Sequence, residues 1–335
     1  MKNLPFIYAL TGILAFFITS YFTPIMREAA IRFGIVDQPD GKLKKQQEPV
    51  PYLGGLAVYL GFLVALAFTF SFDKKVLGVL LGGTLVLVLG LIDDLGRLSP
   101  KVKLGFQLLA AFVLVKSGIR MELVSLPDWA ELPLSVLWIL VVTNAFNIID
   151  IMDGLAAGVA AICCTALFCV SLINDRPAVA MMAIAMAGSL AGFVRFNFSP
   201  AKIYLGDTGS LFVGAVLASL TLIGSYTIKN TVSLLAPVVI LGVPLFDTAF
   251  VSYIRWRRGM PVTLGSPDHF ALRLRKWRLS VPQTVLCSYL ASSILAVCAI
   301  WMMYLSEIGA GLVLVGLTAA ALITGIFLKK IDMTM

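Results

Sequence analysis

Long apolar runs recur along the whole chain and are separated by short polar segments. A run of about 20 apolar residues is long enough to cross the hydrocarbon core of a bilayer as a helix. By this criterion the sequence predicts about 11 spans, near residues 4–23, 52–72, 76–92, 102–117, 134–149, 155–173, 177–194, 210–227, 231–254, 283–304 and 308–328. We therefore predict an all-α polytopic membrane protein, with residues 1–335 forming a single integral-membrane domain.

Composition agrees with this pattern. Hydrophobic residues make up 59% of the chain and charged residues only 13%, and the mean hydropathy is +0.96. An ordinary soluble domain has about 25% charged residues. A soluble globular fold is therefore excluded.

The distribution of charge predicts the orientation. Of the 26 Lys and Arg residues, 19 fall in one set of loops and the other seven in the alternate set. Because Lys and Arg stay preferentially on the cytoplasmic side, the N-terminus should lie outside and the C-terminus in the cytoplasm. The net charge of +8 follows this topology and could also meet headgroups or phosphates, so we predict no nucleic-acid partner.

One apolar run ends in an unusually polar stretch, from Asn144 to Leu155. Four carboxamides and carboxylates recur there at every third position: Asn144, Asn147, Asp150 and Asp153. Ionisable side chains near hydrocarbon are costly and usually line a cavity or a substrate path. On a regular α-helix the four would spread over half the circumference, so we expect the helix to tighten or unwind before Gly154 and to gather them around one ligand. The alternative is the solvated C-terminus of a helix.

Two further motifs carry carboxylates at the ends of apolar runs. Asp93 and Asp94 are adjacent, and neighbouring carboxylates repel each other unless a cation or proton lies between them, which suggests Mg²⁺. A helix stop or a solvated turn is the alternative. The segment Gly206 to Ser210 opens another apolar helix, where free backbone N–H groups favour phosphate and Asp207 could bind a metal. The alternative is a simple N-cap by Thr208 or Ser210.

The first and last cytoplasmic loops are basic. Lysines that include Lys45 follow a Pro- and Gly-containing turn in the first loop and could bind phosphate, although ordinary positive-inside charge explains them equally well. The last loop holds His269, the only histidine, among several arginines. A basic interfacial segment is the alternative there. Asp247 precedes this loop, and it either belongs to the site or pairs with a loop arginine.

These unusual polar residues share one predicted side of the membrane. They come from five regions separated by helices: Asp93, Asp94, Asn144, Asn147, Asp150, Asp153, Asn197, Asp207, Asp247 and His269. Simple solvated loop acids would occur on both sides, and the acids on the outer side belong to no Gly- and Asn-rich motif. The pattern predicts a cytoplasm-facing, metal-assisted site for an anionic substrate.

From Asp37 to about Gln283 the chain resembles the polyprenyl-phosphate N-acetylaminosugar-1-phosphate transferases. The resemblance rests on the Asp93 and Asp94 pair with Lys103 and Gln107 downstream, on the stretch from Asn144 to Leu155, and on Asn197 followed by Gly206 to Ser210. It implies a membrane enzyme that transfers a sugar-1-phosphate from a UDP-N-acetylaminosugar to undecaprenyl phosphate and releases UMP. It implies Mg²⁺ as cofactor, for which Mn²⁺ can substitute, and a place in the bacterial cytoplasmic membrane; we also allow for a homodimer.

The resemblance implies roles for individual residues. Asp93, Asp94 and Asp207 are the expected catalytic residues, and Asp207, Asn147 and Asp94 the expected metal ligands, with a base role for Asp93 left open. The expected substrate-binding residues are Lys45, Lys103, Asn144, Asp150, Asp153, Asn197, His269 and Arg273.

The chain departs from the family pattern at two places. Ile151 and Met152 stand where relatives have a glycine-containing turn, and Ala271 and Leu272 replace two loop histidines. The second departure bears on the sugar. We expect N-acetylglucosamine (GlcNAc), and the alternative within this family is a phospho-N-acetylmuramoyl-pentapeptide transferase, which the incomplete histidine set disfavours. An alternative from another class is a transporter of lipid-linked sugars, whose carboxylates would bind coupling ions.

Overall fold

The computed structural model describes residues 4–37, 49–96, 98–121, 127–261 and 266–333. The chain forms two compact units, Met1–Gly224 and Ser225–Met335. The prediction of a single domain stays a prediction.

The first unit is helical apart from two strands of two residues each. Its elements are α1 (Leu4–Arg32), β1 (Val36–Asp37), β2 (Val50–Pro51), α2 (Gly54–Thr69), α3 (Lys74–Leu95), α4 (Pro100–Lys116), α5 (Asp128–Ile149), α6 (Leu155–Ile173), α7 (Pro177–Asn197) and α8 (Gly206–Ile223). The strands pair antiparallel, with Val36 opposite Pro51 and Asp37 opposite Val50. The second unit contains η1 (Val232–Leu235), α9 (Ala236–Ile240), α10 (Gly242–Arg257), α11 (Phe270–Lys276), α12 (Val281–Met302) and α13 (Glu307–Lys329). The predicted all-α class is confirmed.

The predicted count of about 11 spans is not confirmed. Among the described residues, eight helices are long and apolar enough to cross a membrane, or nine if η1–α9 and α10, which meet at a bend of 78°, form one broken span. The two remaining predicted spans are α2, with 16 residues, and α4, with 17 residues. At about 1.5 Å per residue each measures roughly 25 Å, which is shorter than a hydrocarbon core of about 30 Å. The orientation of the termini stays a prediction.

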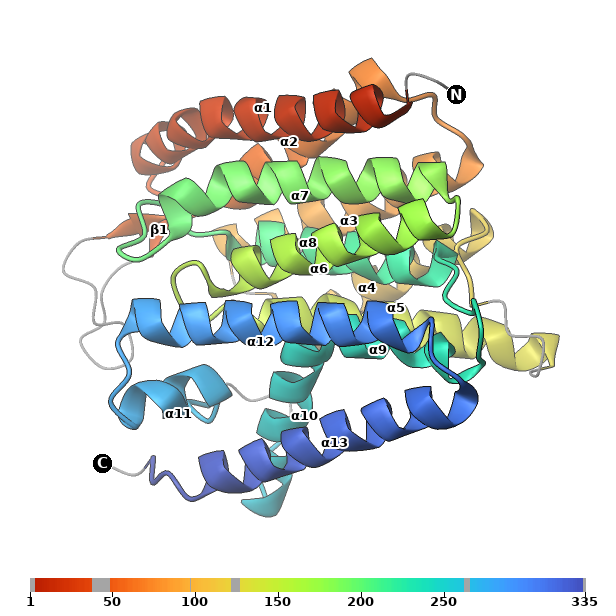
Figure 1. Cartoon of the computed structure of the whole chain (residues 1–335). Helices are drawn as coiled ribbons and strands as arrows, with labels where there is room; N and C mark the ends of the chain where they lie inside the picture. Colours follow the sequence, from red (N-terminus) through yellow and green to blue (C-terminus); the bar gives the residue numbers. More distant parts are fainter. Residues whose placement is uncertain (1–3, 38–48, 97, 122–126, 262–265, 334–335) are drawn as a thin grey trace. The chain divides into compact units, whose positions relative to one another are not determined.

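Helix α8 forms the centre of the first unit. It packs against α2, α3, α5, α6 and α7, and Figure 1 shows it in the interior among these helices. Nearly all of its side chains are buried. The helix with Asp207 in its first turn is therefore held from several sides.

Glycines let neighbouring backbones approach the start of α8 closely. A Cβ on Gly55 of α2 would lie 2.2 Å from the backbone nitrogen of Gly209, and a Cβ on Gly90 of α3 would lie 2.4 Å from the carbonyl oxygen of Asp207. Only glycine permits these two approaches. The approach at Gly90 places the C-terminal end of α3, with Asp93 and Asp94, beside the N-terminal end of α8.

Candidate active site

Asp94 caps the start of α8. Its Oδ1 accepts a hydrogen bond from the backbone N–H of Asp207 (2.9 Å), and its Oδ2 accepts from the backbone N–H (3.0 Å) and hydroxyl (2.6 Å) of Thr208. Gly206 has φ +73°, and a Cβ there would lie 2.7 Å from Asp94 Oδ2. A carboxylate at a helix N-terminus satisfies free N–H groups and the helix dipole.

This contact argues against the prediction that phosphate binds these amides. The Asp94 carboxylate already takes the position of the anion, so the short Gly206 to Ser210 segment is a docking point for α3. The same contact favours a capping role for Asp94 over the predicted role as metal ligand, because both carboxylate oxygens face N–H or O–H donors.

Lys103 lies at the centre of a cluster of oxygens from three other helices. Its ammonium nitrogen is 2.6 Å from Asp207 Oδ2, 2.9 Å from Asp93 Oδ2 and 3.3 Å from Asn147 Oδ1. These residues come from α8, α3 and α5, and Lys103 itself from the first turn of α4. Side chains from four helices thus meet in one cluster, with the positive charge of Lys103 at its centre.

Further hydrogen bonds fix the members of this cluster. Asn147 donates through Nδ2 to Asp207 Oδ1 (2.7 Å) and to the hydroxyl of Ser210 (2.9 Å). The backbone N–H of Leu98 donates to Asp93 Oδ1 (2.7 Å). The side chains of Asp93, Lys103 and Asp207 keep 12%, 19% and 33% of their surface exposed, so the cluster is accessible from outside.

The cluster fits a magnesium ion by the chemistry of its donors. Two carboxylates and one amide oxygen converge on a single cation, and Mg²⁺ takes oxygen ligands, commonly one or two carboxylates completed by water and substrate phosphates. The described residues contain no group of three His, Cys, Asp or Glu side chains arranged to hold a metal. A resident ion would therefore depend on oxygens of Asn147 and of the substrate as well.

Asn144 does not join this cluster. Its side chain forms a reciprocal amide pair with Gln107, at 2.9 and 3.3 Å, and also donates to the carbonyl of Leu140. Gln107 is buried. Buried amides need hydrogen-bond partners, so this pair favours a role in holding α4 against α5 in place of the predicted substrate contact.

The polar stretch unwinds as predicted. Helix α5 ends at Ile149, and α6 begins at Leu155 after Gly154, which has φ +79°. Asp153 Oδ2 accepts a hydrogen bond from the backbone N–H of Ala201 (3.0 Å), and Asn197, which is buried, bridges Gly154 N–H and the carbonyl of Ile203. This geometry favours a structural role for Asn197 and leaves the edge of Asp153 accessible.

Asp150, in the same turn, has a carboxyl group in an unfavourable electrostatic environment. Burial, together with the negative charges of Asp207, Asp94 and Asp153, raises the pKa of its carboxyl group well above its usual range. Among the described residues none donates a hydrogen bond to its side chain. A cation or a hydrogen-bond donor from a ligand would stabilise this carboxylate.

Two tyrosines at the edge of the site were missed by sequence reasoning. Tyr52 donates a hydrogen bond to Asp37 Oδ1 (2.6 Å), and its ring lies 6.1 Å from that of Tyr204. Burial raises the pKa of the Tyr204 hydroxyl, as do the charges of Asp153, Asp37 and Asp150. Their position in the sequence could have indicated them. Tyr204 lies two residues before Gly206, and Tyr52 lies two residues before the glycines that open α2.

The predicted residues of the last loop lie in the second unit. His269 Nδ1 is 2.7 Å from Asp247 Oδ2, so Asp247 pairs with the histidine, and its negative charge also acts on Arg255. Arg273 donates to Asp268 Oδ1 (2.6 Å) and to the carbonyls of Leu328 and Ile331 at the end of α13. Its side chain is 1% exposed. This favours a structural role for Arg273 over the predicted phosphate contact.

Lys45 lies outside the described residues.

Comparison with known proteins identifies the family of the chain. The model of glycosyl transferase family 4 matches residues 76–225, which include the clustered residues. The chain is 37% identical over 287 residues to a probable undecaprenyl-phosphate N-acetylglucosaminyl 1-phosphate transferase of Bacillus subtilis, covering 83% of this chain and 80% of that protein. It is 33% identical to a decaprenyl-phosphate N-acetylglucosaminephosphotransferase of Mycobacterium tuberculosis, covering 86% and 80%.

A relative from the other predicted branch is also similar. A phospho-N-acetylmuramoyl-pentapeptide-transferase of Halalkalibacterium halodurans is 31% identical over 298 residues, covering 80% of this chain and 89% of that protein. The apolar helices of this chain indicate a multi-helix membrane protein. The chain therefore belongs to glycosyl transferase family 4 and is a multi-pass membrane transferase.

Proposed function

We propose that the enzyme transfers GlcNAc-1-phosphate from UDP-GlcNAc to undecaprenyl phosphate, giving undecaprenyl-diphospho-GlcNAc and UMP. The observation that carries this proposal is the convergence of Asp93, Asn147 and Asp207 on one cation, in a chain similar to enzymes named for this transfer. The site faces the cytoplasm of a bacterial inner membrane, where the UDP-sugar is available, and the product initiates a cell-envelope glycan.

The reaction needs charge neutralisation more than it needs a strong base. A lipid monophosphate has a second pKa near 6 and is largely a dianion at neutral pH, so its oxygen is already a nucleophile. That oxygen attacks the β-phosphorus of the UDP-sugar, and the bond between the β-phosphorus and the bridging oxygen breaks as UMP leaves. Repulsion between the two phosphate-bearing substrates is therefore the main barrier.

The clustered residues suit this task. Asp207, Asn147 and Asp93 would hold Mg²⁺, which when bound supplies positive charge to the diphosphate. Lys103 adds a second cation at the same place, and its ammonium can neutralise a phosphate oxygen. Asp94 holds α3 against α8 and so keeps Asp93 and Asp207 close together.

The unwound turn after α5 suits the nucleoside and sugar. Asp150 and Asp153 present carboxylates that can accept hydrogen bonds from hydroxyl and amide groups. The half-buried ring of Tyr204 offers an aromatic face beside them, and aromatic faces stack on nucleobases.

The first experiment is an assay of UMP release by the purified protein in detergent, with undecaprenyl phosphate and Mg²⁺. Each of a panel of UDP-sugars is offered alone, and EDTA is the control. We expect UMP from UDP-GlcNAc only, and none after EDTA. Turnover of UDP-N-acetylmuramoyl-pentapeptide instead would assign the enzyme to the other branch.

The same assay separates transfer from transport. A detergent solution holds no gradient, so a transporter of lipid-linked sugars would release no UMP from any donor. Folded protein that is silent across the whole panel would overturn the proposed reaction.

A further inference from the structure

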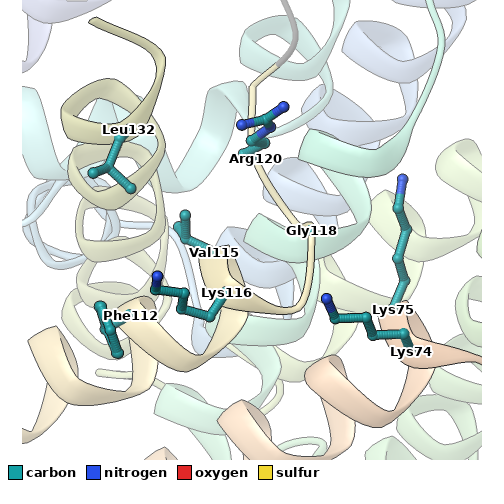
Figure 2. Close-up of a pocket in the computed structure, with 8 residues that line it drawn as sticks. All are labelled: Lys74, Lys75, Phe112, Val115, Lys116, Gly118, Arg120 and Leu132. Atoms are coloured by element: carbon teal, nitrogen blue, oxygen red, sulfur yellow. The ribbon is translucent and has the colours of Figure 1, made fainter. Parts of the chain in front are cut away.

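A second concentration of charge lies at the opposite end of α3 and α4 from the acidic cluster. Here Lys74, Lys75, Lys116 and Arg120 line a pocket of about 620 Å³ together with Phe112, Val115, Gly118 and Leu132 (Figure 2). Lys75 and Asp93 are 18 positions apart on α3, which corresponds to about 27 Å at 1.5 Å per residue. The pocket is therefore separate from the candidate active site.

Close packing of α3 against the end of α4 builds this pocket. A Cβ on Gly78 would lie 2.2 Å from the Cβ of Ser117, so only glycine allows this approach. Gly118 ends the turn after α4 with φ +89°, and a Cβ there would lie 3.7 Å from Lys75 Cε. The lysines at the start of α3 are thereby brought beside Lys116 and Arg120, which belong to a different segment of the chain.

The positive charge in this pocket is not balanced by the described part of the chain. None of the four cations forms an ion pair with a described carboxylate. The neighbouring Asp73 is engaged as the N-cap of α3, where it accepts from the backbone N–H of Val76 (2.8 Å). Lys116 lies over the ring of Phe112 at 5.6 Å. Four cations confined to one hollow repel each other, and an anion would relieve that repulsion.

The position of these cations is also unusual for a membrane protein. Lys and Arg are depleted outside the cytoplasm, and only seven of the 26 fall in loops on this predicted side. Four of those seven line this one pocket. Ordinary helix-end charges would be spread over the separate loops of that side, so the concentration indicates a ligand.

The remaining lining indicates an amphipathic ligand. Figure 2 shows Phe112 and Leu132 across the hollow from Lys74 and Lys75. Both apolar side chains are about half exposed, and Trp129, near the start of α5, is 78% exposed. Exposed tryptophan beside the ends of apolar helices is typical of the headgroup level of a bilayer. A pocket of this volume suits a headgroup, since ligand sites commonly measure about 300–1,000 Å³.

We propose that this pocket binds the phosphate headgroup of an anionic phospholipid, with the four cations contacting the phosphate and Phe112, Val115 and Leu132 contacting the glycerol and the first methylenes of the acyl chains. This proposal is independent of the proposed sugar-phosphate transfer. The bound lipid would tie the start of α3 to the end of α4, the two helices whose other ends carry Asp93, Asp94 and Lys103.

The test compares lipid binding by two variants that each lose two positive charges. The pocket variant is Lys75→Gln with Lys116→Gln, and the matched control is Arg176→Gln with Lys229→Gln, which removes exposed charges of the same predicted side that do not line the pocket. The full chain in detergent is titrated with phosphatidylglycerol, phosphatidylcholine or inorganic phosphate, and bound lipid is measured by native mass spectrometry and by the shift in unfolding temperature.

We expect the wild type and the control to bind phosphatidylglycerol in preference to phosphatidylcholine and to inorganic phosphate. The pocket variant should bind it roughly 30-fold more weakly, from about fivefold for each lysine. Equal binding by the two double variants would overturn the proposal, as would equal binding of phosphatidylcholine. Inorganic phosphate that binds as well as the lipid would make this a free-anion site. If the pocket variant unfolds early without lipid, Lys74→Gln with Arg120→Gln tests the same pocket.

Discussion

Two clusters of carboxylates and cations in this molecule look alike in the sequence and differ in the structure. In the first unit Lys103 is shared among oxygens of Asp93, Asn147 and Asp207, and the charged side chains keep 12–33% of their surface exposed. In the second unit Asp268 and Arg273 are at most 1% exposed. The first cluster is accessible to an ion from solvent, whereas the Asp268 and Arg273 pair of the second is closed to it.

The hydrogen bonds of the two clusters differ in the same way. Arg273 uses its guanidinium on Asp268 and on two backbone carbonyls that end α13, and Asp268 also accepts from Arg258. Such a network holds elements together and leaves little for a ligand. In the first unit one ammonium serves three oxygens, which a divalent ion and phosphates could serve as well. The candidate active site is therefore distinguished by charged groups that are accessible to solvent and whose partner a ligand could replace.

The largest expected effect is on turnover, from Asp207→Asn. The substitution keeps the shape of the side chain and removes one negative charge from the cation cluster, so UMP release should fall by at least about 100-fold. The unfolding temperature should change little. The matched control is Asp175→Asn, which changes an exposed acid at the other end of the first unit. Near-normal UMP release by Asp207→Asn would remove Asp207 from the metal role.

In the second cluster the expected effect is on stability. Arg273→Ala leaves Asp268 buried with fewer partners and frees the carbonyls of Leu328 and Ile331. Breaking a buried ion pair costs about 3–5 kcal/mol. The free energy of unfolding in detergent should fall by that order, while turnover per folded molecule is retained. Loss of turnover with unchanged stability would instead place Arg273 in contact with substrate.

Asn144 and Asn147, one helical turn apart, allow the comparison to be made within a single helix. Asn147→Ala should reduce turnover at least tenfold, because its side chain holds Asp207 and faces the cation. Asn144→Ala should cost roughly 1–2 kcal/mol of stability, from the lost pairing with Gln107, and reduce turnover less. UMP release and unfolding measured on both variants check this, and the reverse pattern would exchange the two roles.

The smallest expected effect is a pH-dependent gain in stability from Asp150→Asn. The raised pKa means that the folded state binds the Asp150 proton more tightly than the unfolded state does, so this group contributes stability at low pH that is lost as pH rises through the raised pKa. Asp150→Asn removes that loss. Without divalent ions, its unfolding temperature should exceed that of the wild type by a few degrees at neutral pH and match it in acid. A constant difference at every pH would contradict the assignment.

Several features of this protein were predictable because they depend on local pattern. Each of the predicted apolar runs contains helix, and the polar stretch between Asn144 and Leu155 unwinds where helical geometry could not gather its side chains. Span number was less predictable. Length along the sequence does not reveal that α2 and α4 are short helices or that η1–α9 and α10 meet at a bend of 78°.

The sequence by itself determined the class of the fold, the family and the set of polar residues that needed an explanation, since hydrophobic runs and motif spacing are local properties. Only the tertiary structure decided what each residue does. The adjacent Asp93 and Asp94 are nearly equivalent in sequence, yet one contacts Lys103 and the other caps α8, because the close approach at Gly90 and Gly206 turns the two carboxylates toward different partners. Those partners lie on helices distant in sequence, and packing alone brings them together.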